Sequence, residues 1–172
     1  ELRGRIAELS IPTTLQSSLM ARLDRLAHAK HIAQIGATLG REFSHALIEA
    51  VSDAPPAQLA RGLEELVAAE VLFRRGTPPD AAYTFKHALL QDTAYESQLK
   101  SRRRELHART ANALAEKFAA RVAAEPQVMA RHCAEGALTA QAIDHYELAA
   151  KQAIARIANT EAADHYERAL EL

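Results

Sequence analysis

The chain has 172 residues, a length typical of one domain or of two small domains that share a boundary. Alanine fills 38 positions and only eight residues are aromatic, which favours small, closely packed helices. Six glycines and six prolines are too few for a turn-rich all-β fold, and a charged fraction of 25% is unlike that of disordered chains. The net charge of -1 gives no overall attraction to nucleic acid or to an anionic membrane.

The apolar runs and the single cysteine bear on the compartment. No apolar run approaches the roughly 20 residues that a membrane span needs, and no signal peptide opens the chain. Cys133 has no partner for an internal disulfide, which fits a reducing compartment. We therefore expect a cytoplasmic protein without membrane contacts. Both ends of the sequence interrupt a pattern, so we also expect a segment of a longer protein.

The first half of the chain is predicted to be mainly helical. Apolar residues recur at helical spacing in four segments: about 13–26, 29–39, 44–51 and 57–70. Gly40 is a natural helix stop, and Ser44 is placed to cap the third helix. We expect Leu63, Leu66 and Val67 of the fourth helix to be buried. Their expected partners are Ile32, Ile35, Leu47 and Ile48.

A change of period follows the fourth helix. Residues 71–75 and 82–86 have strand character, and the segment between them, Gly76 to Asp80, is rich in turn formers. This pattern predicts one β-hairpin and no further strand pair. The last three of these helices are followed by the hairpin, and this is the element order of a winged helix, in which the hairpin is the wing.

From Leu89 onward the pattern is helical. We expect Ser101 to cap one helix and Pro126 to start another. The residues from Ala142 to Ala149 are echoed from Ala162 to Ala169, which indicates stacked helical hairpins similar to tetratricopeptide repeats, with one long helix shared between two hairpins. The predicted fold is mainly α, with about seven to nine helices. A winged-helix region covers residues 1–99 and repeat-like helices cover residues 100–172.

No constellation in the sequence supports catalysis. The GxxxxGK[ST] phosphate loop is missing, so this segment has no P-loop of its own. His28 and His31 lie three residues apart, but no further ligands complete a metal site. His132 and Cys133 are adjacent on a helix and therefore point in different directions, so we expect a buried thiol and not a nucleophile. His145 and His165 occupy equivalent positions in the repeat and are expected to be structural.

DNA binding is the alternative function that a winged helix suggests. The helix at 57–70 carries Arg61 but also Glu64, Glu65 and Glu70, and such a face repels phosphate. Other cations lie at Arg74 and Arg75 on the wing and in a cluster at 100–104, comprising Lys100, Arg102, Arg103 and Arg104. That cluster suits a solvated face or a docking patch for an acidic partner. The sequence leaves open the role of the cluster and that of Arg41.

Several segments together carry a family resemblance. They are residues 11–26, 33–37, 40–43, 85–92, 94–97 and 100–107, the fourth of which reads Phe-Lys-His-Ala-Leu-Leu-Gln-Asp. The chain resembles, over essentially its whole length, the region behind the ATPase module in bacterial adenylate/guanylate cyclase-like proteins. Such proteins combine a class III cyclase, a STAND-type ATPase and tetratricopeptide-like repeats.

The resemblance implies a regulatory segment without catalysis of its own. Its partners would be the upstream ATPase and cyclase domains, and a further protein bound by the repeats. The parent protein would use ATP or ADP with magnesium. Lys86-His87-Ala88 stands where STAND ATPases carry a histidine that reaches the phosphates of ADP, and Asp92 lies further along the same helix. Ala88 replaces the aspartate of the family's Met-His-Asp motif. A capping or packing role for His87 is the alternative.

Overall fold

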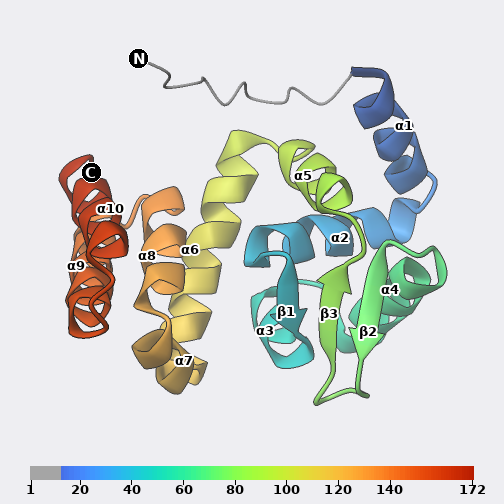
Figure 1. The fold of residues 1–172 in the computed structure, drawn as a ribbon. Coiled ribbons are helices and arrows are strands. Elements are labelled where there is room, and N and C mark those ends of the chain that lie inside the picture. Colours follow the sequence, from blue (N-terminus) through green and yellow to red (C-terminus); the bar gives the residue numbers. More distant parts are fainter. Residues whose placement is uncertain (1–12) are drawn as a thin grey trace.

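The computed structural model describes the backbone of residues 13–172, and the side chains except those at positions 13–17, 27 and 28. This range holds ten helices and three strands (Figure 1). In chain order they are α1 (Thr13–Asp24), α2 (Ala27–Leu39), β1 (Glu42–Ser44), α3 (His45–Val51), α4 (Pro56–Ala68), β2 (Leu72–Arg75), β3 (Ala82–Phe85), α5 (Ala88–Glu96), α6 (Lys100–Lys117), α7 (Ala119–Ala124), α8 (Pro126–Glu135), α9 (Thr139–Ala155) and α10 (Asn159–Leu170).

The elements from α2 to β3 form the winged helix that the sequence predicts. β2 and β3 are the wing hairpin, and the sheet has the antiparallel order β1-β3-β2. Phe43, Tyr83 and Phe85 lie on one face of this sheet and are almost fully buried. The ring centroid of Phe43 lies 5.7 Å from that of Tyr83 and 6.2 Å from that of Phe85. These aromatic side chains join the sheet to the helical core.

Strand β1 corrects the expectation of a single strand pair. Glu42, Phe43 and Ser44 lie opposite Thr84, Tyr83 and Ala82 of β3, so the sheet in the described range has three strands. Three residues with one apolar side chain are too short to show an alternating pattern. The helix count of ten also exceeds the expected seven to nine, and the short helix α7 was not predicted at all.

The predicted helix signals and packing are mostly confirmed. The Ser44 hydroxyl accepts a hydrogen bond from the Leu47 amide at 3.2 Å, and Gly40 follows α2 with φ of 137°. Leu63 and Leu66 are buried, whereas Val67 is only partly buried. Helix α4 approaches α2 closely at Gly62, where an added Cβ would meet Ile32 Cγ1 at 2.8 Å. A larger side chain there would separate the two helices.

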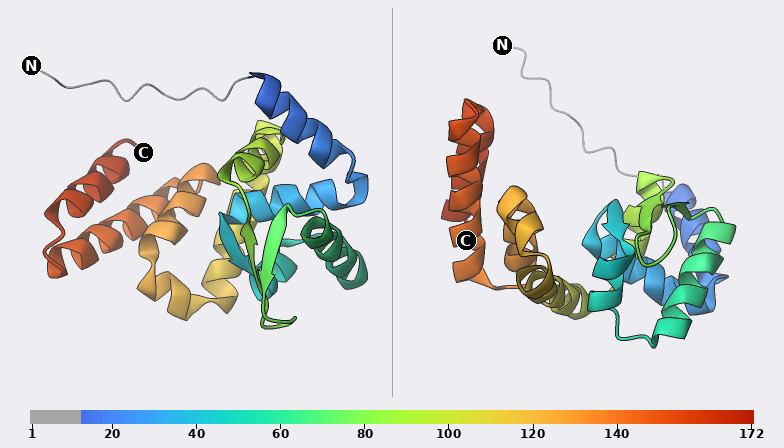
Figure 2. Two further views of the ribbon diagram at one scale, coloured as in Figure 1. Left: turned by 45° about the vertical axis from the view of Figure 1, so that its right-hand side comes forward. Right: turned by 90° about the horizontal axis from the view of Figure 1, so that it is seen from below.

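The C-terminal half is a row of antiparallel helices (Figure 2). Helix α9 contacts both α8 and α10, so one long helix is shared between two hairpins as the sequence predicts. Helix α6 contacts α2 and α3 on one side and α8 on the other, and so lies between the winged helix and the hairpins. The predicted cap at Ser101 is wrong, because α6 begins at Lys100 and Leu99 occupies the N-cap position without a side-chain hydrogen bond.

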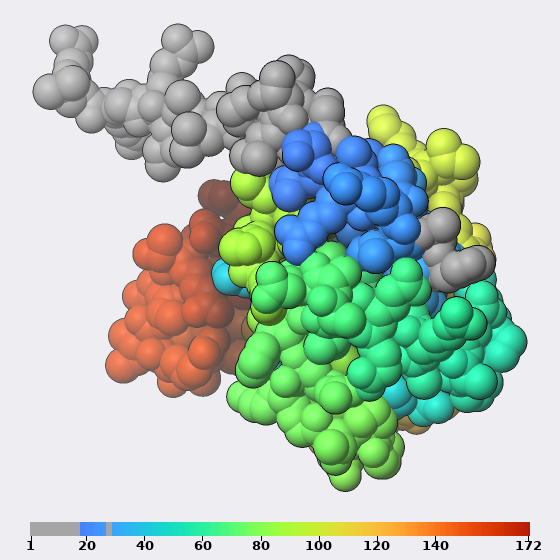
Figure 3. Space-filling view, turned by 90° about the vertical axis from the view of Figure 1, so that its right-hand side faces the viewer, coloured from blue at the N-terminus to red at the C-terminus, as the bar shows by residue number. Residues whose placement is uncertain are grey.

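Helix α1 lies against the winged helix, beside the end of α4 (Figure 3). The Arg22 Nη2 atom donates to the Ala69 carbonyl at 2.6 Å and ties the two helices together. Leu23 is fully buried. In the part of the chain that the structure describes, no helix is both long and apolar enough to cross a membrane.

Candidate functional site

His87 lies two residues after the end of β3, at the N-cap position of α5. Its backbone is extended, with φ of -131° and ψ of 133°, and its side chain makes no capping hydrogen bond. The His87 carbonyl accepts the amides of Leu90 and Gln91 instead. Because the imidazole is exposed and packs into no core, it is available to a ligand at a helix N-terminus, where free amide groups favour anions.

Other basic groups share this end of the sheet. Arg41 lies opposite Phe85, whose amide donates to the Arg41 carbonyl at 3.0 Å, and the Arg41 side chain is exposed. Lys86 Nζ lies 2.9 Å from Glu70 Oε1, and this contact lowers the pKa of Glu70. Asp92 is exposed on α5, more than one turn beyond His87. The structure thus pairs the Arg41 backbone with Phe85, one residue before the predicted Lys86-His87 pair, which sequence spacing could not reveal.

The cations of the wing are paired within the winged helix itself. Arg74 forms an ion pair with Glu64 of α4, and Arg75 Nη2 lies 3.4 Å from Glu42 Oε1. Lys86, which follows β3, is paired with Glu70, so each lysine and arginine of the hairpin and of the residue after it faces a carboxylate. The net charge of each such pair is close to zero, so these cations contribute little to neutralising the phosphates of a duplex.

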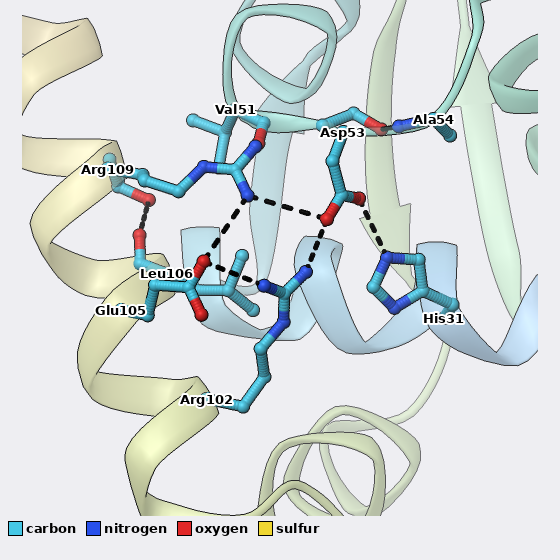
Figure 4. A network of polar contacts seen from close by, with 10 residues as sticks. His31, Val51, Asp53, Ala54, Arg102, Glu105, Leu106 and Arg109 are labelled. Carbon is cyan, nitrogen blue, oxygen red and sulfur yellow. Dashed lines mark hydrogen bonds and ion pairs between the residues drawn. The ribbon is translucent and has the colours of Figure 1, made fainter.

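The predicted basic cluster on α6 is divided by its contacts. Arg102 Nη2 donates to Asp53 Oδ2 at 2.6 Å, and Arg102 Nη1 donates to Glu105 Oε1 at 2.9 Å. Asp53 also accepts from His31 Nε2 at 3.0 Å and lies 3.5 Å from Arg109 Nη1 (Figure 4). Hydrogen bonds from His31 and Arg102 hold the pKa of Asp53 well below its ordinary value. This network fastens the loop between α3 and α4 to α2 and α6.

A second, buried chain of contacts joins α5, α6 and α8. The Tyr95 hydroxyl lies 3.0 Å from His107 Nε2, and His107 Nδ1 lies 3.0 Å from His132 Nδ1. Two protonated Nδ1 atoms could not share this contact, so at least one ring is neutral. Burial lowers the pKa of His107 to about 4 and that of His132 still further. Sequence reasoning missed this chain because its members lie 12 and 25 residues apart.

Cys133, His31 and His165 each contact other side chains of the fold. Cys133 is buried, its thiol donates to Gln141 Oε1 at 3.7 Å, and burial raises its pKa to about 11, as expected for a thiol that is no nucleophile. His31 is held by Asp53, and the described residues contain no cluster of three or more potential metal ligands. The His165 ring stacks on Tyr146, with centroids 6.2 Å apart, as a residue packed between helices does.

Comparisons with known proteins find one similar chain. An uncharacterized protein of Rhizobium meliloti (strain 1021) is 28% identical over 172 residues, which cover 98% of this chain and 17% of that protein. The chain therefore spans about one sixth of the length of this relative. No family model matches the sequence, and no solved structure matches it.

Proposed function

We propose that this chain is a regulatory segment of a longer, cytoplasmic signalling protein of the adenylate/guanylate cyclase-like type, positioned behind a STAND-type ATPase module. The segment itself catalyses no reaction. Its winged helix closes over ADP or ATP, with magnesium, held by an upstream P-loop domain, and its helical hairpins bind a protein partner. The small share of the Rhizobium meliloti protein that the chain covers supports a place within a larger protein.

The observation that carries this proposal is the exposed His87 at the N-terminus of α5. The residues around it suit a phosphate group, because the helix N-terminus carries partial positive charge and the exposed Arg41 side chain belongs to the same end of the sheet. No P-loop occurs in the sequence, so the rest of the nucleotide would be bound by another domain. His87 would then hydrogen-bond a phosphate oxygen in the closed state.

DNA binding remains the alternative for a winged helix, and the contacts of the wing argue against it. The wing cations face Glu64, Glu42 and Glu70, and the exposed side of α4 offers Arg61 beside further carboxylates. Protein affinity for duplex DNA depends mainly on unpaired cations. A gel shift of the 172-residue chain with a random duplex at low salt should accordingly show no complex.

The rate of ADP release from the full-length parent protein tests the proposal. A hydrogen bond to a charged group contributes about 1.5 to 3 kcal/mol, so His87→Ala should accelerate release by about 10- to 150-fold. Lys117→Ala, an exposed cation at the end of α6, is the matched control and should leave the rate unchanged. Circular dichroism of the His87→Ala chain should match wild type. Equal ADP release from His87→Ala and wild type would remove the proposed nucleotide contact.

A further inference from the structure

The corner between α5 and α6 carries cations that the fold leaves without partners. Arg102 is turned toward Asp53 and Glu105. Lys100 and Arg104, in the same turn of α6, are exposed, and neither forms an ion pair with any residue that the structure describes. The basic cluster of the sequence thus has one structural member and others that face outward.

The outward members surround an open pocket of about 390 Å³. Its lining consists of Tyr95 from α5, Lys100, Arg103 and Arg104 from α6, and Glu135 from α8. Three cations against one carboxylate leave the pocket positively charged. Because its walls come from three helices, the pocket exists only where the winged helix meets the first helical hairpin.

The cationic wall is held in place before any ligand arrives. The Arg103 Cζ atom lies 4.9 Å from the centre of the Tyr95 ring, within the range of a cation–π contact. The Tyr95 hydroxyl is in turn fixed by His107, and His107 by His132. A side chain that is already ordered loses less conformational entropy on binding, so this support strengthens any contact that Arg103 makes.

An exposed apolar side chain lies next to these cations. Leu99 directly precedes Lys100 at the start of α6, and 77% of its surface is accessible. A free phosphate or a nucleic acid backbone cannot use an apolar contact, whereas a protein segment can. We infer that the α5–α6 corner is a docking site for an acidic protein segment that also carries an apolar side chain next to its carboxylates.

This inference rests on the part of the proposed function in which the helices after the winged helix bind a protein partner. It does not depend on His87 or on a nucleotide. Binding of a fluorescent Glu-Glu-Leu-Glu-Glu-Leu-Glu peptide to the 172-residue chain, followed by anisotropy at low salt, tests it. We expect micromolar affinity that weakens with salt. A peptide with Gln for every Glu should bind at least about tenfold more weakly, since the charge-assisted contacts are lost.

Matched variants locate the site. Lys100→Glu with Arg104→Glu should weaken the peptide by about tenfold or more, and Leu99→Ser by about threefold. The control Arg61→Glu with Lys117→Glu makes the same change of net charge at exposed cations elsewhere, and should change affinity less than about twofold. Equal losses in the two double variants would overturn the inference, as would complete competition by millimolar inorganic phosphate. Either result is independent of the ADP release measurement.

Discussion

The winged-helix part, residues 27–96, and the last three helices, residues 126–170, are built from different side chains. The twelve largest fully buried side chains of the described residues, among them Tyr83, Phe43 and Leu66, all lie between positions 23 and 85. The buried set of α9 and α10 is mainly alanine, with Tyr146 as its large member. Among the described residues, eight large apolar side chains are exposed, and six of them lie from Leu148 to Leu172.

This difference between the two regions shows that closely packed helices need not be the more stable ones. Alanine lets two helices approach, but it removes little apolar surface from water, and the stabilising free energy scales with that surface. The winged helix buries large side chains between its helices and one face of its sheet, and should unfold as one unit. The hairpins should open locally at a lower free energy, which hydrogen exchange measures as weaker protection.

The largest effect should come from the core of the winged helix. Leu66 is fully buried on α4, so Leu66→Ala should lower the free energy of unfolding by about 2 to 5 kcal/mol, through lost burial and the cavity left behind. Urea denaturation followed by circular dichroism measures the loss. Leu148→Ala on α9 is the matched control, because 40% of Leu148 is already exposed and its truncation should cost much less. A larger loss at Leu148 would reverse the proposed ranking of the two regions.

The next effect should appear on acidification, at the junction between the two regions. The pKa of His107 is about 4 in the folded protein and 6.5 ordinarily, so below 6.5 the unfolded chain binds a proton that the folded one does not. The free energy of unfolding should therefore decrease as the pH is lowered from about 6.5 to about 4, with a loss of about 2 kcal/mol at about pH 5. Above about pH 7 it should no longer change with the state of this ring. The surroundings of His107 and His132 agree with this sign, because burial and the charges of Arg131 on α8, Arg103 on α6 and Arg121 on α7 all disfavour a protonated ring. The other group that faces His107 is the neutral Tyr95 hydroxyl of α5.

Urea midpoints collected across this pH range measure the effect. The double variant His107→Gln with His132→Gln removes both titrating rings, and its stability should vary less with pH than that of wild type. An unchanged slope in this variant would assign the acid sensitivity to other groups.

A smaller effect should follow from the polar network between the two regions. Asp53→Asn removes the charge that faces Arg102 and Arg109, and should cost about 1 kcal/mol near neutral pH, since the network is half exposed. The low pKa of Asp53 means that this contribution disappears as pH falls below its ordinary value of 3.8. A double-mutant cycle with Arg102→Ala should give a coupling energy. Strict additivity of the two substitutions would show that their contact contributes nothing.

The elements predicted from sequence are those whose signal lies within a short stretch. The helices α2, α3 and α4, the wing and the shared helix α9 have clear periodicity, caps or turns. Strand β1 has three residues and exists because β3 lies beside it, and alanine-rich α7 offers no apolar face to recognise. The start of α6 could not be predicted either. The helix begins at Lys100, and Leu99 at its N-cap position makes no side-chain hydrogen bond that would mark this start in the sequence.

The candidate sites divide in the same way. The resemblance of Lys86-His87-Ala88 to the family motif singled out His87, and the structure places it at the N-cap position of α5. The partner of Arg102 is Asp53, 49 positions away, so only the fold separates a structural arginine from the outward-facing Arg104. The sequence therefore locates the charged residues, while the tertiary contacts decide which of them remain available.

The last prediction tests the hairpins directly, and its effect has the opposite sign. Ile157 follows α9 with φ of 62°, a conformation that β-branched residues rarely adopt, and 84% of its surface is exposed. The Ala158 amide still closes the helix by donating to the Ala153 carbonyl at 2.9 Å. Glycine is the preferred residue at such a position, so Ile157→Gly should stabilise the α9–α10 hairpin by about 1 kcal/mol. Exchange protection should rise for the amides of α10 and remain constant in α4. Ile154→Gly, within α9, should instead lower protection, and a loss in both variants would show that the Ile157 side chain, not its backbone, matters.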